Sequence, residues 1–341
     1  MLKNLVPTRH DSALTVTLAM FAVLLLFTFY ASNFEPGTFA ITLLTGVLRA
    51  MLLFLVAAGL SLIFGLMDIL NFAQGGYFML GAYLTYDFVH PGIGIFRFGG
   101  AIEDVTLRFG IGLAIATLIG GLLGYVLERG LLRPLYKRPL FQLVLTFGVS
   151  IILLEAVRAI WGPSPYSWTV RLPIQESQFF IVGQQFSTYR LFVILMGLAL
   201  MAAVVTLLRR TRIGIIIRAG VQDPEMVAAL GINVRGVFTL VFTIGCALAA
   251  LGGGVAVPFL GATNTLGSTF LLAGIAVIVL GGLGSFEGTA IGSFIVGIGW
   301  AAMEVFSVRP EIGTVWASLA PMLLLALVLL LRPKGLFGED R

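Results

Sequence analysis

Long apolar runs separated by short polar stretches are the dominant pattern of this chain. Most runs reach about 20 residues, the length with which an α-helix crosses the hydrocarbon core of a bilayer. They are continuously apolar, whereas the strands of a membrane β-barrel alternate polar and apolar positions, so the pattern argues against a barrel. It predicts ten membrane segments, at approximately 13–32, 39–67, 76–89, 109–127, 141–161, 189–208, 237–257, 270–283, 289–306 and 314–331.

The third and eighth segments, 76–89 and 270–283, are shorter than a full membrane crossing. We expect them to be tilted, broken or partly re-entrant, which is tolerated only where protein or a cavity surrounds the backbone. No repeat with a period of 20–50 residues is visible. The pattern therefore predicts an all-α integral membrane protein. We expect one transmembrane domain over residues 1–341, a polytopic bundle of about 8–10 transmembrane helices, some of them short or broken.

Composition rules out a separate soluble domain of any size. Of the 341 residues, 59% are hydrophobic and only 11% are charged, and the mean hydropathy is +1.04. Soluble domains carry roughly 25% charged residues. The net charge of +5 does not indicate a nucleic-acid partner, because the cationic residues gather in short loops, where they act as topology signals.

The distribution of those cations predicts the orientation in the membrane. If the N-terminus is cytoplasmic, 14 of the 21 lysines and arginines fall in cytoplasmic segments and 5 in external ones. Short loops rich in lysine and arginine stay in the cytoplasm. We therefore expect both termini to be cytoplasmic and the chain to cross the membrane an even number of times.

The cytoplasmic loop at about 209–236 carries signals for a short helix. An aspartate can cap it, a proline fits its first position, a glutamate suits the positive end of its dipole, and a glycine can stop it. Such a helix of about two turns is not stable alone in water, so it must pack against something. It lies either on the membrane surface of this protein or in a docking site on a separate cytoplasmic subunit. The residues concerned are Asp223, Pro224, Glu225, Ala228, Ala229 and Gly231.

Polar residues between the second and third apolar runs are the best candidates for a substrate path. Asp68, Asn71 and Gln74 are spaced three apart, so they share one face if the helix continues through them. Gly75 follows and permits a break or a close helix contact. The alternative is that this stretch only connects two helices on the cytoplasmic side.

Glu155, Arg158 and Glu304 are among the charged residues that fall inside predicted membrane segments. Glu155 and Arg158 stand three apart in the fifth segment, so we expect them to pair as a neutral structural unit. Glu304 has no cationic neighbour in the ninth segment, and we expect it to be structural as well.

Motifs of enzyme chemistry are missing from the sequence. There is no Gly-Lys dipeptide and hence no phosphate-binding loop of the GxxxxGK[ST] type, and neither HExxH nor GxSxG occurs. The only cysteine is Cys246, so no cysteine cluster can hold a metal. We expect no catalytic residues, no metal and no cofactor in this chain. If ATP supplies energy, another chain must bind and hydrolyse it.

Several motifs are together similar to one transporter family. They lie at 59–66, 71–76, 79–83, 211–214, 218–219, 222–223, 229–233, 279–285 and 332–338. From about residue 45 to the C-terminus the chain resembles the LivH-type permeases of branched-chain amino-acid ABC importers. Together the motifs are specific for this permease family, but they distinguish its LivH branch from its LivM branch only moderately. Gln74, where the family often has histidine, and the long external loops depart from the family pattern.

The resemblance implies a set of partners and a location. A second, LivM-like permease subunit would complete the translocation path, two cytoplasmic ATPase subunits would bind ATP and drive it, and an extracytoplasmic binding protein would deliver the substrate. The 223–231 helix would be the coupling helix that docks on an ATPase. The chain would be multi-pass in the cytoplasmic (inner) membrane of a bacterium or archaeon.

The substrate that the resemblance implies is a branched-chain or related small amino acid. Urea, amides and other small polar solutes remain alternatives, because similar permeases carry them. A secondary transporter or channel is a further alternative. It would need ion-coupling carboxylates near the membrane midplane, for which Glu155 and Glu304 are the clear candidates.

Overall fold

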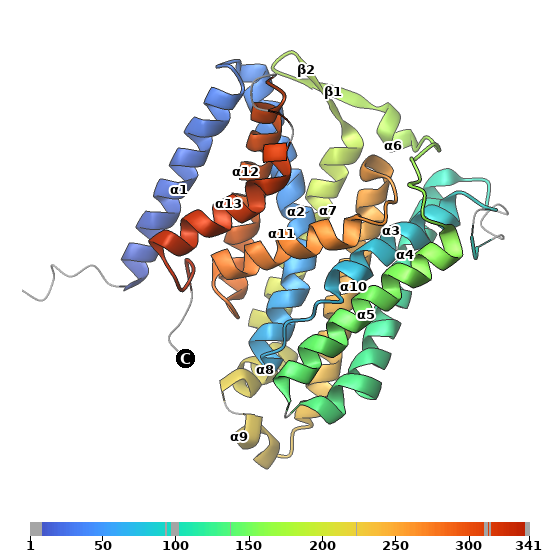
Figure 1. Ribbon diagram of the computed structural model, residues 1–341, viewed down its shortest axis with the longest axis vertical. Helices are drawn as coiled ribbons and strands as arrows, with labels where there is room; N and C mark the ends of the chain where they lie inside the picture. Colours follow the sequence, from blue (N-terminus) through green and yellow to red (C-terminus); the bar gives the residue numbers. More distant parts are fainter. Residues whose placement is uncertain are drawn as a thin grey trace, which may run out of the picture.

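Helices make up nearly all of the regular structure of the chain (Figure 1). The computed structural model describes the backbone of residues 9–92, 94–96, 102–136, 138–222, 224–309, 313 and 315–337. Within these residues, six helices are long and apolar enough to cross a membrane, and shorter apolar helices accompany them. The predicted all-α polytopic fold is confirmed.

Each of the ten predicted membrane segments contains a helix. These are α1 (Arg9–Ala31), α2 (Pro36–Met67), α3 (Gln74–Val89), α4 (Val105–Leu127), α5 (Pro139–Trp161), α7 (Thr188–Arg210), α10 (Val234–Leu260), α11 (Leu266–Gly281), α12 (Phe286–Ser307) and α13 (Val315–Leu331).

The connection between α2 and α3 turns back into the bundle. Asp68 adopts a left-handed conformation (φ 56°) and ends α2. The side-chain nitrogen of Gln74, the first residue of α3, lies 3.5 Å from the carbonyl oxygen of Val56. Val56 precedes Met67 by eleven residues, about 16 Å along the helix. Residues 68–73 therefore run back alongside α2 to the level of Val56. α3 begins there, inside the bundle, as a re-entrant helix.

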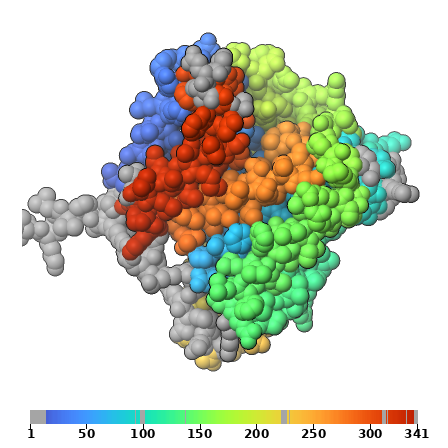
Figure 2. Space-filling view, in the orientation of Figure 1, coloured from blue at the N-terminus to red at the C-terminus, as the bar shows by residue number. Residues whose placement is uncertain are grey.

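A second short helix follows a second break. α11, like α3, has 16 residues, about 24 Å of helix, and it begins after the non-helical stretch 261–265. Figure 2 shows α11 running across one face of the molecule between α13 and α5. Both segments that the sequence predicts to be short or broken are so in the structure.

The order of long helix, break, 16-residue helix and second long helix occurs twice, in α2–α3–α4 and in α10–α11–α12. α2 packs along α12, and α10 packs along α4. α2 and α10 run antiparallel and touch where Gly59 meets Gly245. The two halves therefore have the same order of elements in opposite directions, the arrangement of an inverted repeat.

The core of the bundle is formed by α2, α3 and α10, while α4, α5 and α7 lie outside it. The outer helices expose large apolar side chains such as Leu118, Val144 and Leu195. In a chain of this composition that surface faces lipid. Close packing inside depends on glycine: a Cβ added to Gly253 of α10 would overlap the carbonyl oxygen of Phe78 in α3.

Small elements cap the two ends of the bundle, at the top and bottom of Figure 1. At one end lie α6 (Pro173–Glu176) and an antiparallel hairpin of β1 (Gln178–Ile181) and β2 (Gln184–Ser187). At the other end lie α8 (Arg212–Gln222) and α9 (Pro224–Ala229). A π-helical turn, η2 (Glu128–Leu132), and a 3₁₀ turn, η3 (Arg133–Leu135), join α4 to α5. The hairpin and α8 were not predicted.

Candidate functional site

The re-entrant segment holds the polar residues that the sequence singled out. Asn71 and Gln74 are fully buried. The side-chain amide of Asn71 donates to Gln74 Oε1 at 3.1 Å, and Gln74 Nε2 donates to the carbonyl oxygen of Gly245 at 2.8 Å. Gly75 packs against the backbone of Gly267 at the start of α11. These residues join α3 to α10 and α11.

Asp68 lies apart from the other three. The interpretation that Asp68, Asn71 and Gln74 share one helical face is wrong, because the left-handed Asp68 ends α2 and the residues that follow are not helical. Asp68 is exposed, whereas Asn71 and Gln74 are inside the bundle. A role of these residues in a path or gate stays a prediction.

The predicted helix of the cytoplasmic loop is present as α9. Gly231 has φ 81°, and the Ile232 N–H donates to the Val227 carbonyl oxygen at 3.3 Å, the closing bond of a glycine-terminated helix. Asp223 lies outside the described residues, as do the side chains of Pro224, Glu225 and Ala228; Ala229 is exposed. The predicted length and stop of the helix are confirmed.

α9 projects from the end of the bundle at which α8 lies and packs against α8. Val227 is buried and tethers α9, while Met226 and Leu230 are 50% and 71% exposed. In α8, Ile217 packs in a cluster with Leu66 of α2, and cationic side chains lie on its opposite face. The arrangement presents a small apolar tip on a base that packs against α2 and α7.

Two ion pairs involve charged residues of the predicted membrane segments. Glu155 and Arg158 pair at 2.7 Å, as expected from their spacing. Glu304 is also paired, which the sequence did not reveal: Arg49 Nη2 of α2 lies 2.5 Å from Glu304 Oε2 of α12. The Arg49 guanidinium also lies 4.7 Å over the ring of Trp300. The two partners are 255 residues apart, so local spacing carried no signal.

A buried carboxylate organises the connection between α4 and α5. Glu128 accepts a hydrogen bond from the Tyr136 hydroxyl and pairs with Arg133 at 3.3 Å. Arg133 also donates to the Thr239 hydroxyl of α10 at 2.6 Å. Burial, and then the Glu128 carboxylate, raise the pKa of Tyr136 well above its usual value. The network ties the π-helical turn to the base of α10, next to α8 and α9.

An aromatic cluster covers the C-terminal end of α3. His90 stacks on Tyr86 with ring centroids 4.0 Å apart and meets Trp168 edge-on at 4.9 Å. His90 Nδ1 lies 3.1 Å from the Tyr86 carbonyl oxygen, which can only accept, so Nδ1 carries the proton. Burial lowers the pKa of His90, and nearby Arg108 lowers it further, against the raising effect of the Tyr86 carbonyl.

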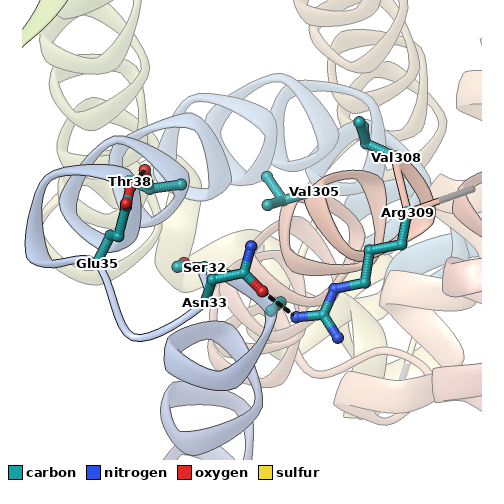
Figure 3. A pocket seen from close by; sticks show the side chains of 8 residues that line it. Ser32, Asn33, Glu35, Thr38, Val305, Val308 and Arg309 are labelled. Carbon is teal, nitrogen blue, oxygen red and sulfur yellow. Dashed lines mark hydrogen bonds between the residues drawn. The ribbon is translucent and has the colours of Figure 1, made fainter.

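A polar pocket of about 330 Å³ opens where the C-terminal ends of α1 and α12 meet the N-terminal end of α2 (Figure 3). Arg309 donates to Asn33 Oδ1 at 2.6 Å, and Glu35 accepts from Thr38 at 3.2 Å. The arginine also lies 5.0 Å from the ring of Tyr30. These contacts fasten the end of α12 to the turn between α1 and α2.

Comparison with known proteins decides the family. The sequence model of the family described as "Branched-chain amino acid transport system / permease component" matches residues 42–331. The chain belongs to this family. The match covers both halves of the inverted repeat and the α8–α9 segment.

Curated relatives agree with the family. The permease is 30% identical over 293 residues to the high-affinity branched-chain amino acid transport system permease protein LivH of Salmonella typhimurium, covering 84% of this chain and 91% of LivH. BraD of Pseudomonas aeruginosa is 30% identical, with the same shares covered. The fructose import permease protein FrcC of Rhizobium meliloti is 25% identical over 240 residues, which cover 68% of this chain and 64% of the length of FrcC.

Family membership and fold together place the chain among the membrane-spanning permease subunits of transport systems. Its relatives are transport permease subunits, which are not enzymes. The apolar helices and these relatives support a multi-pass protein of the inner membrane. A permease component implies partner subunits, and the resemblance to LivH-type permeases inferred from the motifs is confirmed.

Proposed function

We propose that the permease is the membrane-spanning subunit of an ABC importer for branched-chain or related small amino acids. Separate cytoplasmic ATPase subunits bind and hydrolyse the ATP. A second, LivM-like permease subunit completes the path, and an extracytoplasmic binding protein delivers the substrate. Family membership and the LivH and BraD relatives support this proposal.

The observation that carries the proposal is the exposed tip of α9. Met226 and Leu230 are apolar and exposed at the inner end of a chain in which no ATP-binding motif occurs. A two-turn helix on a firm base is suited to a groove of a partner protein. In the proposed cycle, ATP-driven closure of the ATPases moves α9. α8 and the base of α10 pass this movement to the bundle.

The proposal is tested by co-purification of the permease with its cytoplasmic partners. The native chain is compared with a deletion of residues 223–231 and with Ala228→Pro, which breaks α9. We expect capture of an ATPase by the native chain and its loss in both variants. Ala228→Ser keeps the backbone N–H and nearly the same volume, so it is the matched control and should retain the ATPase.

Two results would contradict the proposal. One is the absence of any ATPase from the native preparation. The other is uptake by the purified permease that an ion gradient alone drives, which would make it a secondary transporter or channel. The FrcC relative favours testing other small solutes as well. Competition of labelled leucine uptake by urea, amides and sugars separates these substrate classes.

A further inference from the structure

The Arg49–Glu304 pair lies at a depth where charge is costly. α2 has 32 residues, about 48 Å of helix, which exceeds a hydrocarbon core of about 30 Å at both ends. Arg49 follows Pro36 by 13 residues, about 20 Å, so its backbone lies inside the outer half of the membrane. Ionisable residues at such depth face a bundle interior, a partner or a water-filled path rather than lipid.

The pair is also incompletely satisfied. A guanidinium has five N–H donors, and Arg49 uses one of them within the described residues, toward Glu304 Oε2. The Arg49 side chain is 20% exposed and that of Glu304 is 49% exposed. Lipid offers no hydrogen-bond partner to the remaining donors and to Glu304 Oε1. Polar groups must therefore meet this surface in the membrane.

The surroundings of the pair fit one class of ligand. A neutral amino acid carries a carboxylate, which a guanidinium binds in a fork of two hydrogen bonds, and an ammonium group, which pairs with a carboxylate. Trp300, under the guanidinium, meets Phe270 of α11 at 6.2 Å, so the charges adjoin an aromatic surface suited to an aliphatic side chain.

We propose that Arg49, Trp300 and Glu304 form a contact site for the zwitterionic head group of the amino acid in transit, on the face of the bundle that lines the translocation path. The inference rests on the proposed import function. When a zwitterion binds, the Arg49–Glu304 ion pair is replaced by one pair between Arg49 and the ligand carboxylate and one between Glu304 and the ligand ammonium. The summed charge of these two side chains and the ligand stays zero throughout. Such an exchange gives weak binding, which suits release along a path.

The other polar groups of the membrane region serve this purpose less well. Asn71 and Gln74 are fully buried and their amides are bonded within the bundle. Glu155 and Arg158 pair one turn apart on α5, and both are more than 40% exposed. That pair is near the outer end of its helix, so it serves as a matched control.

A cysteine at position 45 tests whether the site is reached from water. Thr45 is half-buried and lies one turn before Arg49 on the same face of α2, under the side chain of that arginine. Thr45→Cys leaves the ion pair intact. The assembled transporter in membranes is treated with a permanently charged methanethiosulfonate reagent, and labelling is followed over time. Native Cys246 is buried, and Leu118→Cys on α4 is the lipid-facing control.

We expect the reagent to label Thr45→Cys and not Leu118→Cys. Leucine should slow the labelling several-fold, whereas leucinamide, which lacks the carboxylate, and 4-methyl-2-oxopentanoate, which lacks the ammonium, should not. Absence of labelling would overturn the proposal, because lipid or the second permease subunit would then cover the face. Labelling that leucine leaves unchanged would overturn it too. Capture of the ATPase is scored separately, so failure of the import function is distinguishable.

A neutral double variant gives the second measurement. Arg49→Gln with Glu304→Gln removes both charges and leaves neither unpaired. We expect leucine uptake to fall by about tenfold or more, because charge-assisted hydrogen bonds to the substrate are lost. The amount in the membrane and the captured ATPase should be unchanged. Glu155→Gln with Arg158→Gln removes a comparable pair and should retain uptake. Wild-type uptake by the Arg49–Glu304 double variant would overturn the proposal.

Discussion

Gly253 and Gly148 both lie within membrane helices, yet they meet opposite surroundings. A Cβ added to Gly253 would overlap the carbonyl oxygen of Phe78, which belongs to the backbone of α3 and cannot move alone. A Cβ added to Gly148 of α5 would meet nothing within 4 Å. The composition predicts close helix packing from 42 glycines. Only the structure tells which of them are needed.

Gly253→Ala should therefore destabilise the permease by about 1–3 kcal/mol or more, the cost of overpacking a tight core. Gly148→Ala should be neutral or stabilising by up to about 1 kcal/mol, because alanine favours helix. The thermal unfolding midpoint of both variants in the same detergent checks this. Equal midpoints would contradict the packing described for α3 and α10.

His90 should make stability depend on pH at the outer surface. Its folded-state pKa lies below the ordinary value of 6.5, because burial disfavours the charged ring. The unfolded chain therefore binds more protons below pH 6.5, and this part of the stability is lost as the pH falls through the folded-state pKa. The unfolding midpoint should drop from pH 7 toward about pH 5, and less so in His90→Gln. The same pH dependence in the variant would contradict this role.

Local spacing explains which residue contacts the sequence could predict. Glu155 and Arg158 are three apart on one helix, so their pairing follows from helix geometry alone. Arg49 and Glu304 come from the two halves of the chain and meet only because α2 packs along α12. The candidate substrate contact was therefore outside the reach of local reasoning.

At the scale of elements, the π-helical turn η2 positions a buried charge. Glu128 Oε2 has no hydrogen-bond partner among the described residues. The buried carboxylate is therefore stabilised through Oε1 alone, which accepts from the Tyr136 hydroxyl and pairs with Arg133. π-helical turns often mark functional positions. This one lies where movement of α8 and α9 would reach α10.

Tyr136→Phe should lower stability by about 1.5–3 kcal/mol, because it removes a hydrogen bond to a buried charge. Tyr125→Phe is the matched control: its hydroxyl meets the exposed Arg129, so its loss should have little effect. Unfolding midpoints of the two variants in the same detergent check the difference. A Tyr136→Phe protein as stable as wild type would show that Glu128 is satisfied in another way.

In the 209–236 loop, the helix with proline at its start and glycine at its end was predicted, whereas α8, which the Thr211 hydroxyl caps, was not. Proline at the start and glycine at the end fixed α9, and the structure places its stop at Gly231. α8 has no proline at its start and no glycine at its end, and the sequence left it as loop. The end of α2 was predicted at Met67, where the structure has it, although Asp68, rather than a glycine, takes the left-handed conformation that closes the helix.

At the scale of the molecule, the predicted orientation places the β-hairpin outside and α9 inside. Gln184→Cys in the hairpin should react with a membrane-impermeant thiol reagent in intact cells. Leu230→Cys on α9, in the permease expressed without its cytoplasmic partners, should react only after the membrane is opened. Both positions are exposed, and the buried Cys246 supplies no background. The opposite pattern of labelling would invert the topology inferred from the positive charges.

The inverted repeat left only a faint echo in the sequence, between residues 71–75 and 285–288, for a physical reason. In lipid, a helix position needs only to be apolar or small, so two halves can keep one architecture without keeping matching residues. The helix lengths and the number of membrane segments could be predicted, because bilayer thickness sets them. The pairing of α2 with α12 and of α10 with α4 could not, because it depends on contacts between distant parts of the chain.

The re-entrant start of α3 has a consequence for how the protein is made. A ribosome delivers Gln74 to the membrane long before Gly245, the residue whose carbonyl oxygen it binds, because 171 residues separate them. During that interval α3 is too short to span the bilayer and has no α10 to cover it. Nascent chains that end before α10 should therefore hold this segment in a protected site of the insertion machinery, and the bundle can close only late in synthesis.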